Sequence, residues 1–71
     1  MSPTNRHRAE RAMMVLMRYA ALRFSPDRDT AIVHLLTDIA HFCDQHQLPY
    51  ERLVATAIDQ WQRQRQPEAR S

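Results

Sequence analysis

The chain has 71 residues, a formal net charge of +2, hydrophobic residues at 44% of its positions, and no glycine. A domain of this length buries only about 60% of the surface that its unfolded chain exposes, so its own core is small. A single cysteine excludes an intrachain disulfide, and the lack of glycine argues against the phosphate-binding and dinucleotide-binding loops that need positive φ angles. We therefore expect stabilisation by helix packing or by association, without a cofactor.

The first predicted helix covers residues 6–24 and follows a lead-in, 1–5, that we expect to be flexible. Its main apolar stripe is formed by Met13, Leu16, Met17, Ala20 and Phe24. Its reverse side carries a second set, in which arginines accompany two apolar residues: Arg8, Arg11, Val15, Arg18 and Leu22. A helix that is apolar on two sides requires burial on both. Two further helices can cover only one of them, so this pattern predicts contact with a second chain.

The second predicted helix covers residues 26–46. Ser25 is the expected N-cap, Pro26 suits the first helical position, and Asp27 places a negative charge in the first turn. The apolar positions recur at helical spacing, with polar residues on the opposite side: Ile32, Leu35, Leu36, Ile39, Cys43 and His46.

The third predicted helix covers residues 49–65, after a break at Leu48 that Pro49 imposes. Its apolar face is Tyr50, Leu53, Val54, Ala57, Ile58 and Trp61. Residues 66–71 contain Pro67 and are expected to be flexible. The sequence thus predicts one all-α domain over 1–71, in which the second and third helices form a hairpin, the first packs across it, and the whole is oligomeric.

Charge is distributed unevenly along the chain. Residues 1–24 hold five arginines and one glutamate, residues 25–51 hold one arginine and five acids, and residues 52–71 hold four arginines and two acids. The first helix is therefore basic and the second acidic, which favours their packing within one chain or between chains.

Two groups of side chains have residue types that can carry chemistry. His34, Asp38 and His41 share one face of the second helix, but one helix alone lacks the additional element that completes a metal site. Cys43 lies within the apolar stripe, where a cysteine usually serves as a small core residue, and His46 suits the helix C-terminus. We expect no metal site, no catalytic residues and no enzymatic activity.

The segment Leu36–Asp44, LTDIAHFCD, followed by Gln47, Pro49, Tyr50 and Leu53, resembles short bacterial proteins encoded on phages and other mobile elements. The resemblance covers residues 35–61 and departs at Gln47, where such proteins commonly carry glycine. It implies a protein that binds and inhibits or modulates a larger host complex, such as a CRISPR or other defence assembly.

A second resemblance is to ribbon-helix-helix repressors. Residues 21–27, ALRFSPD, are similar to their DNA-contacting strand and helix start, and residues 50–58 to their second helix. This alternative, a dimeric DNA-binding regulator of ribbon-helix-helix or helix-turn-helix type, implies DNA contacts by Arg23, Arg6 and Arg8. The spacing from Pro26 to Pro49 is longer than expected of that family, and the helical pattern continues through Phe24.

The function that the sequence favours is a non-enzymatic protein-protein interaction module. The expected partner-binding residues are Val15, Leu22, Arg11, Arg18 and Arg8, and the expected partner is a second copy, a host complex, or both. The longest apolar run, 12–17, falls far short of the ~18 residues of a membrane span. With no secretory signal and an unpaired cysteine, we expect a cytoplasmic protein without a membrane partner.

Overall fold

The computed structural model describes the backbone of residues 3–70 and the side-chain environments of residues 4–65. The chain forms three helices, α1 (Pro3–Arg23), α2 (Arg28–Gln45) and α3 (Tyr50–Arg70), and residues 3–70 contain no strand. The predicted all-α class with three helices is therefore confirmed. Residues 1, 2 and 71, part of the segments predicted to be flexible, lie outside the described residues.

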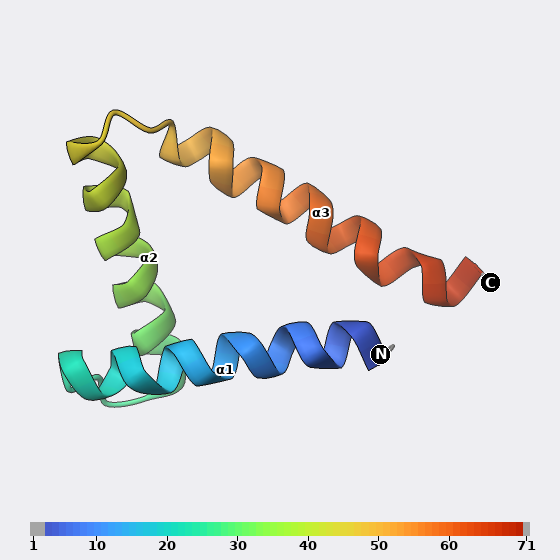
Figure 1. Cartoon of the computed structure of the whole chain (residues 1–71), viewed down its shortest axis with the longest axis horizontal. Coiled ribbons are helices and arrows are strands. Elements are labelled where there is room, and N and C mark those ends of the chain that lie inside the picture. Colours follow the sequence, from blue (N-terminus) through green and yellow to red (C-terminus); the bar gives the residue numbers. More distant parts are fainter. Residues whose placement is uncertain (1–2, 71) are drawn as a thin grey trace.

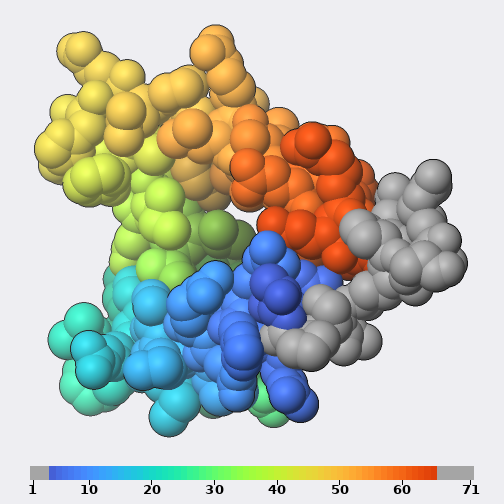
Figure 2. Space-filling model, turned by 45° about the vertical axis from the view of Figure 1, so that its right-hand side comes forward, coloured from blue at the N-terminus to red at the C-terminus, as the bar shows by residue number. Residues whose placement is uncertain are grey.

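The three helices form the sides of an open triangle (Figure 1). Its Cα atoms extend over 41 × 28 × 15 Å, so the molecule is a plate only one helix layer thick. The most extensive contact is between α1 and α2, and a smaller one joins α2 to α3. The first turns of α1 meet the distal part of α3 (Figure 2), where Asn5 Nδ2 donates a hydrogen bond to the Gln64 carbonyl oxygen at 3.0 Å.

The helix pair α2–α3 is a widely opened version of the predicted hairpin. The two helices follow one another through a short loop, and their axes diverge from it (Figure 1). Helix α3 continues beyond the predicted end at residue 65 and includes Pro67. Because α3 diverges from α2, the apolar residues Leu53, Ile58 and Trp61 remain about half exposed and do not form the core that their spacing predicts.

Both interhelical turns place a residue other than glycine in the left-handed region of the backbone. Phe24 has a φ angle of 55°, and the N–H group of Ser25 donates to the Ala20 carbonyl oxygen at 3.1 Å. Gln47 has a φ angle of 56°, and the N–H group of Leu48 donates to the Cys43 carbonyl oxygen at 2.8 Å. These are Schellman-type helix ends, in which glycine is the usual residue because a Cβ atom is disfavoured there.

The start of α2 lies two residues later than predicted. Asp27 is the N-cap, and its carboxylate accepts a hydrogen bond from the Thr30 N–H group at 2.7 Å. Ser25 is not the cap, because its N–H group terminates α1 and its hydroxyl lies 3.1 Å from His34 Nδ1. The prediction that Ser25 caps this helix was therefore wrong, since the turn at the end of α1 already uses that residue.

The described residues form almost no interior. Only Ala31 and Cys43 are buried, whereas fifteen large hydrophobic side chains are exposed. The accessible surface is 6300 Å², about 1,700 Å² more than the roughly 4,600 Å² of a compact monomer of this mass. The Cα radius of gyration is 14.2 Å, against about 11 Å for a compact chain of this length. One layer of helices has no second layer against which to bury its apolar faces.

Candidate partner-binding surface

The exposed apolar residues of α1 include a set flanked by arginines, which we call the arginine-rimmed patch: Arg8, Arg11, Met14, Val15, Arg18 and Leu22. Val15 is 58% exposed and Leu22 79% exposed. Arg11, Met14, Val15 and Arg18 line a shallow groove along the helix. The five residues predicted from the sequence to bind a partner thus lie along one side of α1.

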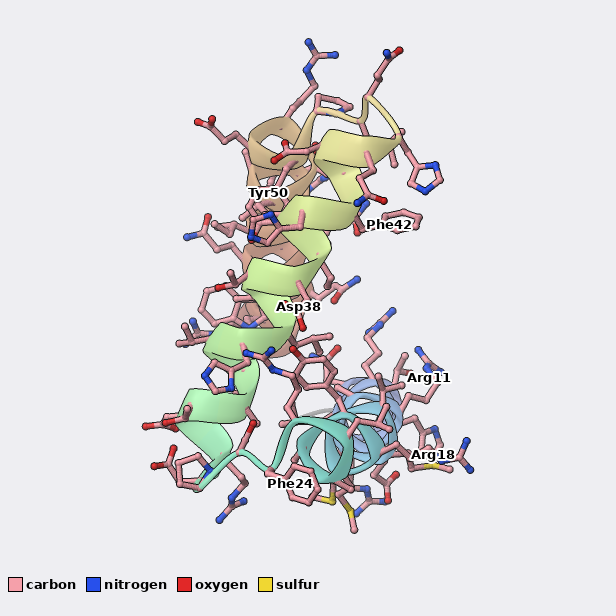
Figure 3. All side chains as sticks on the ribbon, turned by 90° about the vertical axis from the view of Figure 1, so that its left-hand side faces the viewer. Arg11, Arg18, Phe24, Asp38, Phe42 and Tyr50 are labelled. Carbon is pink, nitrogen blue, oxygen red and sulfur yellow. The ribbon has the colours of Figure 1, made fainter. Side chains whose placement is uncertain are left out.

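The rim of the patch is strongly basic. Arg11 and Arg18 project away from α2 on the side of the plate to which Phe42 also points (Figure 3). Arg8 is half-buried and its Nη1 donates to Asn5 Oδ1 at 2.5 Å, which ties it to the corner between α1 and α3. Guanidinium groups that surround apolar side chains suit a partner surface that offers carboxylates beside its own apolar residues.

A polar cluster attaches α1 to α2 beside this patch. The Tyr19 hydroxyl donates a hydrogen bond to Asp38 Oδ2, and Arg23 Nε lies 3.8 Å from the same oxygen. Partial burial and the hydrogen bond to the Asp38 carboxylate raise the pKa of the Tyr19 phenol. The Tyr19–Asp38 hydrogen bond therefore holds α1 on α2 beside the patch, and the longer Arg23–Asp38 ion pair is exposed and adds little.

The side chains of His34, Asp38 and His41 do not come together. His34 contacts Ser25, Asp38 contacts Tyr19, and His41 is exposed. Among the described residues, no group of three or more His, Cys, Asp or Glu side chains is arranged to hold a metal ion.

Cys43 and His46 are likewise engaged separately. Cys43 is a free, buried thiol, as expected of a core residue. The His46 ring lies against the Phe42 ring, with centroids 4.3 Å apart. Within the described part of the chain, the structure gives no hydrogen bond between Cys43 and His46.

The DNA-contacting strand implied by the ribbon-helix-helix resemblance is absent from residues 3–70. Ala21 and Arg23 belong to the last turn of α1, because the helical pattern that begins at Ala12 continues through them. Arg23 pairs with Asp38, Arg8 faces Asn5, and Arg6 is exposed elsewhere on the helix. The three arginines assigned to DNA under that alternative do not form one surface.

Met13, Met17 and Phe24 form a second exposed surface at α1. Met13, Met17 and Phe24 belong to the predicted main stripe, yet they are 53%, 66% and 90% exposed. From that stripe only Leu16 and Ala20 are partly covered, at the side of α1 from which Tyr19 reaches α2. Met13, Met17 and Phe24 repeat at i, i+4 and i+11, which is the spacing of a helix seam and could have indicated a separate contact.

Comparison of the chain with protein-family models, with curated proteins and with solved structures finds no significant match. None of the helices in the described residues is both long and apolar enough to cross a membrane.

Proposed function

We propose that this protein is a non-enzymatic protein-protein interaction module that binds its partner through the arginine-rimmed patch. The observation that supports this proposal best is the near absence of a core: only Ala31 and Cys43 are buried among the described residues. A chain with so much uncovered apolar surface gains stability by association. The patch combines apolar residues with arginine, a residue type enriched in binding hot spots.

The two apolar centres of the patch contribute a useful amount of binding free energy. Burial of a valine or leucine side chain contributes about 1.5–3 kcal/mol, so covering the exposed fractions of Val15 (58%) and Leu22 (79%) would contribute about 3 kcal/mol. That corresponds to an affinity change of about 150-fold. The partner that fits is an apolar surface with acidic neighbours, and the resemblance to mobile-element proteins would place it in a host complex whose function the binding blocks or modulates.

The test compares three forms of the chain as baits for affinity capture from a bacterial lysate. The wild type is matched with the double variant Val15→Glu/Leu22→Glu and with Val33→Glu, a control that adds a carboxylate at an exposed residue of α2. We expect a partner that wild type and Val33→Glu retain and the double variant loses, while all three keep the same helicity. Capture that is equal for all three forms would refute the patch as the docking site.

The same samples distinguish a DNA-binding function. Binding to duplex DNA that weakens steeply with salt and with Arg23→Ala would favour the regulator alternative. A chain that ignores duplex at low salt would leave the protein-binding proposal in place.

A further inference from the structure

We propose that α1 also pairs with α1 of a second copy of this chain, antiparallel, along its outer edge. The contact surface, which we call the outer seam, is Arg6, Glu10, Met13, Met17 and Phe24. This surface is distinct from the arginine-rimmed patch, so the partner proposed above and the second copy bind different sides of α1.

The outer seam has the geometry of a helix-pairing surface. Arg6, Glu10, Met13 and Met17 follow one another at intervals of four, three and four positions, which keeps them on one side of the helix as in a coiled coil. Phe24 directly follows Arg23, the last residue of α1, and extends the seam beyond the helix end. Figure 3 shows Phe24 on a side of α1 different from that of Arg11 and Arg18. Met17 is 66% and Phe24 90% exposed, so α2 and α3 leave the seam uncovered.

Charge favours a second copy in the antiparallel direction. In a parallel pair, Arg6 would lie beside Arg6 of the partner subunit and Glu10 beside its own copy, which places like charges together. In the antiparallel pair, Met13 lies opposite the partner's Met17 and Phe24 opposite the partner's Arg6, where a cation–π contact forms. Each seam therefore supplies both halves of the contact, as a two-fold interface requires.

The remaining arginines do not oppose this pairing. Arg8, Arg11 and Arg18 lie at positions of the other helical stripe, so an antiparallel α1 pair keeps them out of the interface. Arg23 is paired with Asp38 of its own chain. The helix dipoles also align favourably in this direction.

The area that the chain leaves exposed fits two separate contacts. Its accessible surface of 6300 Å² exceeds that of a compact monomer by about 1,700 Å², roughly twice the ~800 Å² that a standard interface takes from each partner. Self-association along the outer seam would cover part of that excess. The arginine-rimmed patch would remain exposed for a second contact.

Phe24 provides an independent indication. An aromatic residue with a φ angle of 55° is disfavoured in a position where glycine fits, and its ring is 90% exposed. A solvent-exposed aromatic residue in a disfavoured backbone conformation is typical of a residue that binds a partner. The antiparallel pair gives that ring a partner.

The test measures the mass of the purified full chain by sedimentation equilibrium over a wide concentration range. We expect a dimer that is weakened at least about tenfold by Met17→Glu and by Phe24→Asn. Asparagine tolerates the left-handed backbone, so Phe24→Asn keeps the turn and removes only the ring. Val33→Glu serves as the matched control and should leave the dimer unchanged.

Two results would overturn the outer seam. One is a wild-type chain that stays monomeric and folded at every concentration, which would leave the arginine-rimmed patch free for its own partner. The other is a dimer that Met17→Glu and Phe24→Asn leave intact but Val15→Glu/Leu22→Glu dissociates, which would move self-association to that patch.

The orientation is tested by oxidative cross-linking of cysteine variants. The antiparallel pair places Met13 opposite the partner's Met17, so Met13→Cys/Met17→Cys should form a disulfide-linked dimer while Met17→Cys alone forms little. Efficient cross-linking of Met17→Cys alone would show a parallel pair and refute the antiparallel arrangement.

Discussion

Gln47→Gly isolates one backbone feature, the left-handed residue after α2. Gln47 has a φ angle of 56° and is exposed, so the change removes a disfavoured Cβ contact without removing a buried side chain. A residue other than glycine is destabilised by about 1–2 kcal/mol in the left-handed region. Glycine removes this destabilisation, but its greater flexibility in the unfolded chain offsets part of the increase in stability. We expect a net increase of about 0.5–1 kcal/mol in the free energy of unfolding.

The expected shift in melting temperature follows from the chain length. An unfolding entropy of about 2.1 cal/mol/K per residue gives about 0.15 kcal/mol/K for this chain, so Tm should rise by about 3–7 °C. Circular dichroism melts at matched protein concentration measure it. Gln45→Gly is the control, because Gln45 is the last residue of α2 and has a helical backbone, where glycine gives no relief from a left-handed angle and should lower stability.

Opposite signs for the two glutamine variants would support the assignment of the turn. A Tm that falls for both variants would contradict the left-handed backbone at Gln47.

Three further predictions concern pH and packing. The hydrogen bond from the Thr30 N–H group lowers the pKa of Asp27. The ionised Asp27 carboxylate therefore stabilises the fold above the usual carboxyl pKa, and this stabilisation is lost as pH falls through the lowered pKa. Asp27→Asn still caps the helix but does not titrate, so Tm should depend less on pH on the acid side. The pKa of Tyr19 is raised by partial burial and by Asp38. The neutral Tyr19 phenol therefore stabilises the fold below the usual phenol pKa, and this stabilisation is lost as pH rises through the raised pKa. Tyr19→Phe should therefore remove that alkaline loss, and an unchanged alkaline limb would contradict it. Ala31→Leu should destabilise the chain by about 1–3 kcal/mol in urea titrations, because Ala31 is 1% exposed and leaves no room for a larger side chain; a neutral result would show that α2 is loosely packed there.

The helices were predictable because their signals are local. Apolar residues repeat at helical spacing, Pro49 breaks the chain at the start of the third helix, and Asp27 belongs to the predicted start of the second. The exact N-cap was not predictable, since Ser25 and Asp27 both suit it and the choice depends on how the preceding turn closes. The left-handed conformation of Phe24 was missed for the same reason, as only glycine would have signalled it.

The candidate surfaces were predictable in part. Val15 and Leu22 were assigned to an outward face because arginines flank them, and they are exposed in the structure. Met13, Met17 and Phe24 belong to the predicted main apolar stripe, and their spacing shows only that they share a side of the first helix. Which side meets α2 depends on the crossing of two helices, and the Tyr19–Asp38 contact that fixes it joins residues distant in sequence. The open divergence of α3 is also a tertiary property, which leaves Trp61 half exposed despite a core-like spacing.

We propose that association completes a fold whose own chain buries little apolar surface. Tm and light-scattering mass, measured together over serial dilution, test this proposal. Because association stabilises only the folded chain, we predict that mass falls from dimer to monomer and that Tm falls with it. A chain with monomer mass throughout and a Tm that does not change on dilution would show that the fold does not depend on association.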